Sequence, residues 1–442
     1  MRWCVLWMCV SALAACDDGA ESDEAPDMAV NAGGAGGADA EVADADLPDA
    51  MVSEDADVTP DATVGPETIA AQEVGQPEPW GQPLVDYLAD GEAHVGPDGV
   101  FQRGIHDLVP FDDQLFFGYG DATVNLGRVT PIEFRAFTDP GDPTAVVTEF
   151  ASDEEQIDRF RLIDGVLYQA GIDATEDAWL GNVYRRPPGG EWVKHRTVNN
   201  GVHVHDVVGF EGELYAVGSG GTPEEWMGGN VYGHLWRSED QGATWSVVDR
   251  VHNGLMGDTR WVRLMAAGGE LYMFGYRSDR MGQIYEFPTG QLATSLRRVD
   301  LLPDEHPFGR FFATETDMIA PDVALLRGVD VAAPPLEYVT WRVDSDGIAP
   351  VEALAGLTLI DVSVHQETGE ILLLAHEGSD FEQVNALTSW SVRVLVATGP
   401  DLEEVVELTR FETDVRPRAA AWWRGALYYG DDSGEVWRSE AR

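Results

Sequence analysis

The segment Glu211-Gly-Glu-Leu-Tyr215 shows the pattern that decides the fold, a polar turn followed at once by a short apolar strand. The pattern recurs at intervals of roughly 50 residues, the spacing of four-stranded propeller blades. Clear copies are Asp113-Gln-Leu-Phe-Phe-Gly118, Asp164-Gly-Val-Leu-Tyr168 and Gly268-Gly-Glu-Leu-Tyr272. Weaker copies are Pro321-Asp-Val-Ala-Leu-Leu326, Thr368-Gly-Glu-Ile-Leu372 and Arg424-Gly-Ala-Leu-Tyr428. Together they predict an all-β chain with a single β-propeller of seven blades, and six or eight blades remain as alternatives.

A second strand recurs after these turns and predicts the same architecture. Gly233-His-Leu-Trp236 and Gly434-Glu-Val-Trp437 are two of its copies, and no segment shows sustained helical periodicity. The last blade stops at Arg442, one strand short of a complete sheet. We therefore expect residues near 85–103 to supply its outer strand, which closes the ring and leaves no sheet edge exposed.

The N-terminus reads as an export signal. Arg2 precedes a short apolar run over residues 3–13, which is too short to span a membrane as a permanent helix. Leu13-Ala14-Ala15-Cys16 follows and resembles the lipobox of bacterial lipoproteins. The resemblance implies cleavage before Cys16 and a lipid anchor on that cysteine, in the inner or the outer membrane. The alternative is an ordinary signal peptide that happens to contain cysteines.

Residues 17–80 read as a disordered acidic tether. Ala, Gly, Asp, Glu and Pro dominate this segment, and no Lys or Arg occurs between Cys16 and Arg103. Such a composition cannot bury enough apolar surface to offset the entropy of ordering. The sequence therefore predicts a signal peptide over 1–16, a linker over 17–80 and the propeller over 81–442, with the membrane as a partner only through the anchor.

The overall charge and the cysteine positions exclude several functions. The formal net charge is -50, so a phosphate backbone would be repelled and nucleic-acid binding is not expected. All three cysteines, Cys4, Cys9 and Cys16, lie in the N-terminal segment. The predicted propeller therefore has no disulfide, thiolate metal site or cysteine nucleophile, and neither a metal nor a cofactor is predicted.

One segment has the sharp pattern Ser-x-Asp-x-Gly-x-Thr-Trp. Its residues are Ser238, Asp240, Gly242, Thr244 and Trp245. Asp240 can accept backbone N–H bonds across a turn, Gly242 permits a positive φ, and Trp245 can pack into the blade. The segment is a complete Asp-box, so the chain resembles the Asp-box propellers, which include sialidases and non-enzymatic binding proteins. In those proteins the motif is a structural hairpin, so it predicts the fold and not an activity.

Charged residues occupy one repeated place on the expected inner strands. Counting back from the repeated leucine gives Asp107, Arg159, Asp206 and Arg263. One residue earlier in register stand His106, His205 and Arg418. We favour an ion network between blades, in which opposite charges offset each other's desolvation. The alternative is a polar site at the mouth of the channel.

Two loops expected on the binding face of the propeller match each other. They contain Asp177 with Trp179 and Glu225 with Trp226. An acid beside an exposed tryptophan suits sugar stacking or a protein hot spot. The competing interpretation is that each tryptophan covers its own blade.

No assembled catalytic motif is present. The sequence contains no Gly-x-Ser-x-Gly elbow, no His-Glu-x-x-His and no phosphate-binding loop. The Arg-Ile-Pro motif of sialidases is also missing, because Arg103 is followed by Gly-Ile-His. We therefore predict a lipid-anchored envelope propeller that binds a protein or glycan without catalysis. The alternatives are a sialidase-like glycoside hydrolase that uses channel-mouth carboxylates and arginines, and a structural spacer of the envelope.

Overall fold

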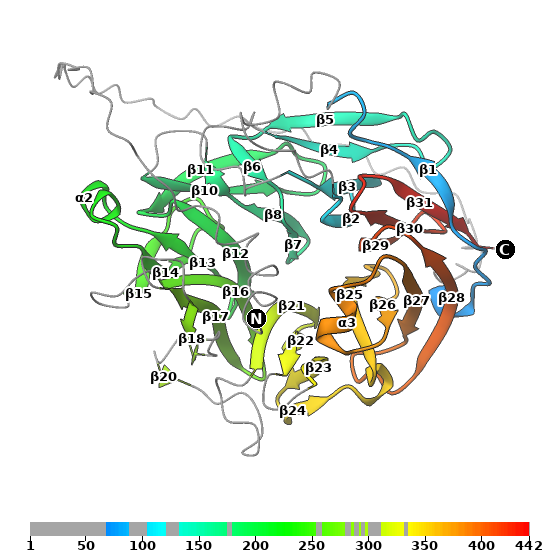
Figure 1. The fold of residues 1–442 in the computed structure, drawn as a ribbon. Coiled ribbons are helices and arrows are strands. Elements are labelled where there is room, and N and C mark those ends of the chain that lie inside the picture. The colour runs from blue at the N-terminus through cyan, green and yellow to red at the C-terminus, as the bar shows by residue number, and fades with distance from the viewer. Residues whose placement is uncertain are drawn as a thin grey trace, which may run out of the picture. The chain divides into compact units, whose positions relative to one another are not determined.

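The computed structural model describes ten stretches of the chain (Figure 1). They are residues 68–87, 104–120, 132–174, 179–252, 259–278, 284–286, 291–292, 297–298, 311–330 and 335–441. The predicted signal peptide with Cys16, and the tether as far as residue 67, lie outside them. Among the described residues, no helix has the length and apolar character needed to cross a membrane.

Six four-stranded sheets make up most of the molecule. The first contains β2 (Asp107–Phe111), β3 (Gln114–Gly118), β4 (Glu133–Phe137) and β5 (Val146–Ala151). The second contains β7 (Phe160–Ile163), β8 (Val166–Ala170), β10 (Leu180–Arg186) and β11 (Val193–Asn199). The third contains β12 (His203–Phe210), β13 (Glu213–Gly220), β14 (Tyr232–Ser238) and β15 (Ser246–Val251).

The other three four-stranded sheets follow after residue 310. One contains β21 (Phe311–Ala320), β22 (Val323–Asp330), β23 (Glu337–Asp344) and β24 (Gly347–Pro350). The next contains β25 (Leu357–Val364), β26 (Ile371–Glu377), β27 (Trp390–Ala397) and β28 (Val405–Thr413). The last contains β29 (Pro417–Trp423), β30 (Ala426–Asp431), β31 (Val436–Glu440) and β1 (Glu78–Gly81).

A seventh large sheet and a few short elements complete the fold. The sheet contains β16 (Thr259–Ala267), β17 (Glu270–Ser278), β18 (Ile284–Glu286), β19 (Gln291–Leu292) and β20 (Arg297–Arg298). The short elements are β6 (Glu154–Gln156) paired with β9 (Ile172–Ala174), η1 (Ile69–Ala71), α2 (Pro223–Met227), η4 (Glu352–Leu354) and α3 (Phe381–Val384).

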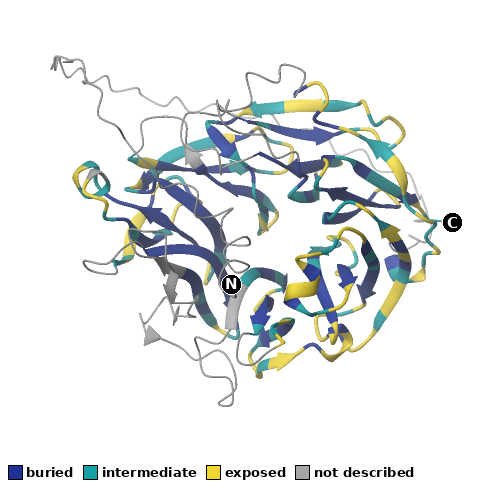
Figure 2. Ribbon diagram, viewed as in Figure 1, coloured by how far each residue is buried: buried dark blue, intermediate teal, exposed yellow. Residues whose placement is uncertain are grey.

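The sheets stand around a central axis, so the predicted all-β propeller is confirmed (Figure 1). In the large sheets the first strand in sequence lies nearest the axis, except in the last sheet, where β29 lies innermost and β1 is the outer strand. A ring of six blades is established, within the range that the sequence allowed, and the predicted count of seven is not confirmed. Figure 2 shows that the inner strands are mostly buried and that exposed residues gather on outer strands and turns.

The repeated polar turns are tight hairpins between the first two strands of a blade. At Glu211 and Gly212, φ is +51° and +81°, and at Asp164 and Gly165 it is +50° and +73°. Two successive residues with positive φ match the right-handed twist of the flanking strands. Glycine adopts this conformation without strain, which explains the polar-Gly pair in the repeat.

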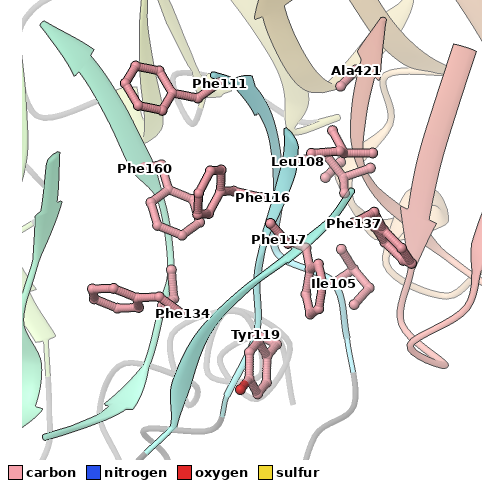
Figure 3. Packing of buried hydrophobic residues seen from close by; sticks show 14 of the residues in the cluster. Ile105, Leu108, Phe111, Phe116, Phe117, Tyr119, Phe134, Phe137, Phe160 and Ala421 are labelled. Carbon is pink, nitrogen blue, oxygen red and sulfur yellow. The ribbon is translucent and has the colours of Figure 1, made fainter. Parts of the chain in front are cut away.

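The core between the first two blades is rich in aromatic residues (Figure 3). The ring of Phe134 lies 4.4 Å from that of Trp192 and 4.9 Å from that of Tyr184, centroid to centroid. Phe116 lies 5.9 Å from Phe160 across the same interface. Each fully buried ring stabilises the fold by about 1.5–3 kcal/mol through removal of apolar surface from water, so this interface joins the two blades firmly.

The closing strand comes from a segment earlier than predicted. β1 pairs antiparallel with β31, with Glu78 opposite Arg438 and Gly81 opposite Val436. The expectation that residues near 85–103 close the ring is therefore wrong. The described part of that range, residues 85–87, forms a turn.

Residues 68–80, which the sequence assigned to the linker, lie with the propeller. Ile69 is fully buried, and its N–H donates to the Glu370 carboxylate at 2.6 Å. Further along, the Arg135 guanidinium donates to the Pro83 carbonyl at 2.7 Å. This peripheral strap therefore contacts the β25–β28 blade, pairs with β31 and reaches the first blade.

The Asp-box segment forms the predicted hairpin between β14 and β15. Asp240 accepts from the Thr244 N–H at 2.8 Å, and the Trp245 indole donates to the Gly242 carbonyl at 3.0 Å. The Gly242 φ is +90°, and the Trp245 side chain is buried. The local geometry agrees with the structural role expected for this motif.

Candidate functional site: the charged channel

Charged side chains stand at corresponding positions of the inner strands. On β12, β16, β21 and β25 the residue directly after a β-bulge is Asp206, Arg263, Glu315 and Asp361, respectively. A bulge re-aims the side chain beside it, so these four groups reach the channel by the same local device. Asp107 begins β2 and Arg159 directly precedes β7, so all four residues of the predicted charged place lie at inner strands.

Three of these carboxylates also fasten neighbouring blades together. Asp107 accepts from the Phe160 N–H at 2.6 Å, Asp206 from the Leu264 N–H at 2.9 Å, and Asp361 from the Ala420 N–H at 2.8 Å. Each bond runs from one inner strand to the inner strand of the next sheet in the chain. These contacts are hydrogen bonds to the backbone, and they connect strands by a different means from the predicted ion network.

On one side of the channel the carboxylates are bridged by arginines. This bridged side comprises Asp158, Arg159, Arg161, Asp206, Arg263, Glu315, Asp317 and Arg327. Glu315 lies 2.8 Å from both Arg159 and Arg263, and the Arg263 guanidinium lies 2.9 Å from Asp158. The bridges join the β7 region to β21, so they cross the channel rather than follow the ring (Figure 1).

These bridges keep Glu315 ionised although it is buried. Burial alone would raise the pKa of this carboxyl, but the Arg263 and Arg159 guanidinia outweigh it and hold the pKa well below its usual value. Burial alone would lower the pKa of Arg159, but the nearby carboxylates of Glu315 and Asp317 outweigh it and raise the pKa above its usual value. Glu315 and Arg159 are therefore both held in their charged forms within the bridged side.

The other side carries two carboxyls of a different kind, Asp107 and Asp361, which we call the carboxyl side. Within the residues that the structure describes, neither forms an ion pair. Burial raises the pKa of Asp107 to about 6. Burial, together with the charge of Asp107, raises the pKa of Asp361 to about 8. Near neutral pH, one of these carboxyls is mostly ionised and the other mostly protonated.

The carboxyl side adjoins a small polar group at the start of β2 and β29. His106 contacts the Gly120 carbonyl through Nε2 at 3.0 Å, and burial followed by the charge of Arg418 lowers its pKa. Arg418 is itself held in an ion pair by Asp432, and both side chains are about one-third exposed, at 34% and 37%. His106 and Arg418, both predicted as channel residues, thus lie at the more solvent-accessible end of the site.

His205 lies on the bridged side and is neutral. Burial, then the neighbouring His203 and Arg260, holds its pKa well below the usual value. The His203 and His205 rings are parallel, with centroids 5.7 Å apart. Among the described residues, no group of three or more His, Cys, Asp or Glu side chains is arranged to hold a metal ion.

The predicted binding loops are only partly described. Trp226 lies on α2, and its ring centroid is 5.7 Å from that of His203. Glu225 caps the same helix, accepting from the Thr222 N–H at 2.8 Å, and also pairs with Arg250. Trp179 is partly buried, and Asp177 lies outside the described residues. The contacts of Glu225 and Trp226 match the interpretation in which each tryptophan covers its own blade.

Two of the four residues that follow the bulges, Glu315 and Asp361, were missed by sequence counting. Glu315 and Asp361 occupy the same place as Asp206, but the count from the repeated leucine does not reach them. A second bulge between Met318 and Ala320 shifts one hairpin. In the other, β25 ends at Val364 and β26 begins only at Ile371. The fourth or fifth residue of β12, β16, β21 and β25 is charged, and this position, counted from the strand start, was the signal available.

Comparison with known proteins finds similarity only among solved structures. No family model matches the chain, and no curated protein gives a significant sequence match. Among solved structures, it is similar to a xyloglucanase from Xanthomonas campestris, with 10% identity over 79% of this chain and a TM-score of 0.42. The chain spans about half, 53%, of that enzyme. A polysaccharide lyase bound to a sulfated ulvan fragment shows 10% identity, with 83% of this chain and 93% of that chain covered and a TM-score of 0.41.

A third similar structure is the extracellular domain of a putative hybrid two-component system from B. thetaiotaomicron. Its identity is 11%, the match covers 84% of this chain and 44% of that one, and the TM-score is 0.46. Likeness at this level assigns neither a family nor an activity to this chain.

The prediction of a non-catalytic binding protein is corrected by this comparison. The similar structures include a glycoside hydrolase and polysaccharide lyases, so the non-catalytic interpretation has no support among them. Whether this chain has such an activity depends on its own residues, to which the proposal below is confined.

Proposed function

We propose that the chain is a glycan-processing enzyme, a glycoside hydrolase whose acid and base are the two carboxyls of the carboxyl side. The observation that carries the proposal is that Asp107 and Asp361 lack the arginine partners that neutralise the other channel carboxylates. Both hold a neighbouring strand by a backbone bond, so both are positioned without a charge partner. Asp361 keeps 9% of its surface exposed.

The two protonation states fit the two roles in glycoside hydrolysis. A pair of carboxyls serves when one protonates the glycosidic oxygen while the other activates water or attacks the sugar. Asp361, with a pKa of about 8, is the acid, and Asp107, with a pKa of about 6, is the base or nucleophile. Because the two groups interact, kcat/KM should follow a bell between macroscopic values near 6 and 8.

The test uses a panel of soluble polysaccharides and measures reducing ends released by the wild-type chain and by two variants. Asp107→Asn and Asp361→Asn should each lower kcat by roughly 10²- to 10⁴-fold, because each removes one proton-transfer group. The amide oxygen can still accept the Phe160 or Ala420 N–H, so both variants should fold.

Asp206→Asn is the matched control. Asp206 follows the same bulge as Asp361 and holds the next strand in the same way, but it is paired with Arg161 at 2.7 Å. At a temperature well below its melting point this variant should keep wild-type kcat. Wild-type activity in both Asp107→Asn and Asp361→Asn, or no release from any polysaccharide by the wild-type chain, contradicts the proposal.

We also infer that the β16–β20 sheet is a blade of the same ring, which gives seven blades. Leu264 on β16 supports this, because its N–H donates to Asp206 and its carbonyl accepts from the Thr316 hydroxyl at 2.7 Å. One residue thus links the sheets on both sides. A crystal structure in which β16 lies outside the ring would contradict this count.

We further propose that the chain is exported and acylated at Cys16, as its resemblance to bacterial lipoproteins implies. The support is the sequence Leu13-Ala14-Ala15-Cys16 and the acidic segment after it, which has no Lys or Arg before Arg103. Metabolic labelling with a fatty acid should mark the wild-type chain and a Cys9→Ser control but not Cys16→Ser. Equal labelling of Cys16→Ser would contradict the anchor, and membrane fractionation would tell the inner from the outer membrane.

A further inference from the structure

We infer that the substrate of this site is an uncharged glycan, and that the site discriminates against glycans bearing carboxylates or sulfates. The inference rests on the proposed function and names its substrate class. It depends on how the arginines around the channel are used, which the sequence alone could not show.

Sites that recognise an anionic sugar present guanidinium groups to the ligand, often in bidentate geometry. Among the residues that the structure describes, five arginines around the channel each form an ion pair with a carboxylate of the same chain. The pairs are Arg159 with Glu315, Arg161 with Asp206, Arg263 with Asp158, Arg327 with Asp317 and Arg418 with Asp432. An arginine held in this way offers little positive potential to a substrate.

The bridged arginines are also poorly placed to change partner. The side chains of Arg263 and Arg327 are only 9% and 5% exposed. Glu315 is shared by Arg159 and Arg263, so withdrawing either guanidinium toward a ligand would leave a buried charge with fewer partners. Leaving a buried ion without its partner is strongly unfavourable. The sialidase-like arrangement, in which arginines bind a substrate carboxylate, therefore does not fit these residues.

The exposed end of the site gives the same conclusion. Arg418 is the most exposed of the five, with 34% of its side chain accessible, and Asp432 neutralises it. Asp432 also lies beside the segment that precedes β2. A Cβ added to Gly104 would lie 3.3 Å from Asp432 Oδ1 and 3.7 Å from the His106 ring, so Asp432 and His106 both pack against Gly104. Burial and the charge of Arg418 keep His106 mainly neutral by lowering its pKa.

The carboxyl side adds negative charge whenever Asp107 is ionised, and the chain as a whole has a formal charge of -50. Of the five arginines named above, all described by the structure, none is left without a carboxylate partner, so a polyanionic glycan approaching this mouth meets like charge that they do not offset. Repulsion of this kind is screened over a Debye length of about 8–10 Å at physiological salt. Discrimination should consequently weaken as the salt concentration rises.

The test compares kcat/KM on matched polysaccharides, hydroxyethyl cellulose against carboxymethyl cellulose and a neutral galactan against pectate, within whichever pair the wild-type chain cleaves. The uncharged member should be preferred, and the preference should shrink in 0.5 M salt, a condition chosen about threefold above physiological ionic strength. Asp432→Asn releases Arg418 and should raise the relative rate on the anionic member by roughly fivefold, the effect expected of one partly exposed charge contact.

Glu239→Gln is the matched control, because it removes one negative charge from an exposed partner of Arg237 in the hairpin between β14 and β15. Its preference should equal that of the wild-type chain. Equal or better cleavage of the anionic member, or an Asp432→Asn variant with unchanged preference, overturns the inference while the hydrolase proposal stands. Absence of cleavage on every polysaccharide overturns the hydrolase proposal and this inference with it.

Discussion

The two sides of the channel use the same structural device and end with different chemistry. Asp206 on the bridged side and Asp107 on the carboxyl side each accept a backbone N–H from the next inner strand. Asp206 in addition has Arg161 at 2.7 Å, whereas Asp107 has no ion pair among the described residues. The difference teaches that the position in the blade determines where a carboxyl lies, while the arginines on other strands determine whether it forms an ion pair.

The largest expected effect comes from breaking the bridged side at Glu315. Glu315→Gln removes the shared partner of Arg159 and Arg263 and leaves two buried guanidinia incompletely compensated. The free energy of unfolding should fall by about 3–5 kcal/mol, as for other buried pairs that lose one member. Urea denaturation followed by tryptophan fluorescence measures this.

The control for that variant is Glu407→Gln. Glu407 pairs with Arg393 at 2.7 Å and Arg410 at 3.2 Å on β28, where its side chain is 33% exposed. An exposed pair of this kind contributes less than about 1 kcal/mol. If Glu315→Gln were no more destabilising than Glu407→Gln, the bridges across the channel would not be structural.

The same Asp→Asn substitution, made once on each side of the channel, should give the next largest effect. Asp206→Asn keeps an oxygen for the Leu264 N–H but leaves Arg161 without its carboxylate, so we expect a loss of about 2–3 kcal/mol in unfolding free energy. Asp107→Asn keeps the hydrogen bond from the Phe160 N–H and leaves no arginine without an ion-pair partner. Its loss should stay below about 1 kcal/mol. Equal losses in the two variants would show that the arginine is not what distinguishes the sides.

The sequence predicts the fold well because the fold depends on local patterns. The hairpin at Glu211 and Gly212 needs two positive φ values, and a polar residue followed by Gly predicts such a hairpin from a single repeat. The same holds for the hairpin closed by Asp240 and Thr244. Such features require no knowledge of what lies across the ring.

The site is predicted less well because it depends on register and on long-range pairing. Asp361 belongs to the ring of charges, yet a longer hairpin after Val364 moves it out of the count. Its unpaired state follows from the positions of arginines on other blades, which no local pattern encodes. The closing strand was missed for a related reason, since Glu78-Pro-Trp-Gly81 is short, contains a proline and becomes a strand only by pairing with β31.

The carboxyl side should reveal itself in the pH dependence of stability. The folded-state pKa of Asp361 is raised to about 8, so between pH 4 and 8 the folded chain binds a proton that the unfolded chain has lost. Stability should therefore fall as pH rises through this window, with a slope of at most about 1.4 kcal/mol per pH unit from this group. In Asp361→Asn this contribution should disappear, whereas in Asp206→Asn it should remain. Chemical denaturation from pH 5 to 9 compares the slopes.

The bridged side should show the smallest effect, and with the opposite sign, through His205. Burial, His203 and Arg260 hold the folded-state pKa of His205 well below its usual value of 6.5, so the unfolded chain binds the proton first. Stability should consequently fall as pH drops below about 6.5, where the carboxyl side is gaining stability. His205→Gln should reduce this acid-side loss and leave the slope above pH 7 unchanged. His205→Gln and Asp361→Asn are each compared with the same wild-type dependence of unfolding free energy on pH. If the acid-side loss survives in His205→Gln, a group other than His205 causes it. If the slope above pH 7 changes in His205→Gln, the two sides of the channel are coupled.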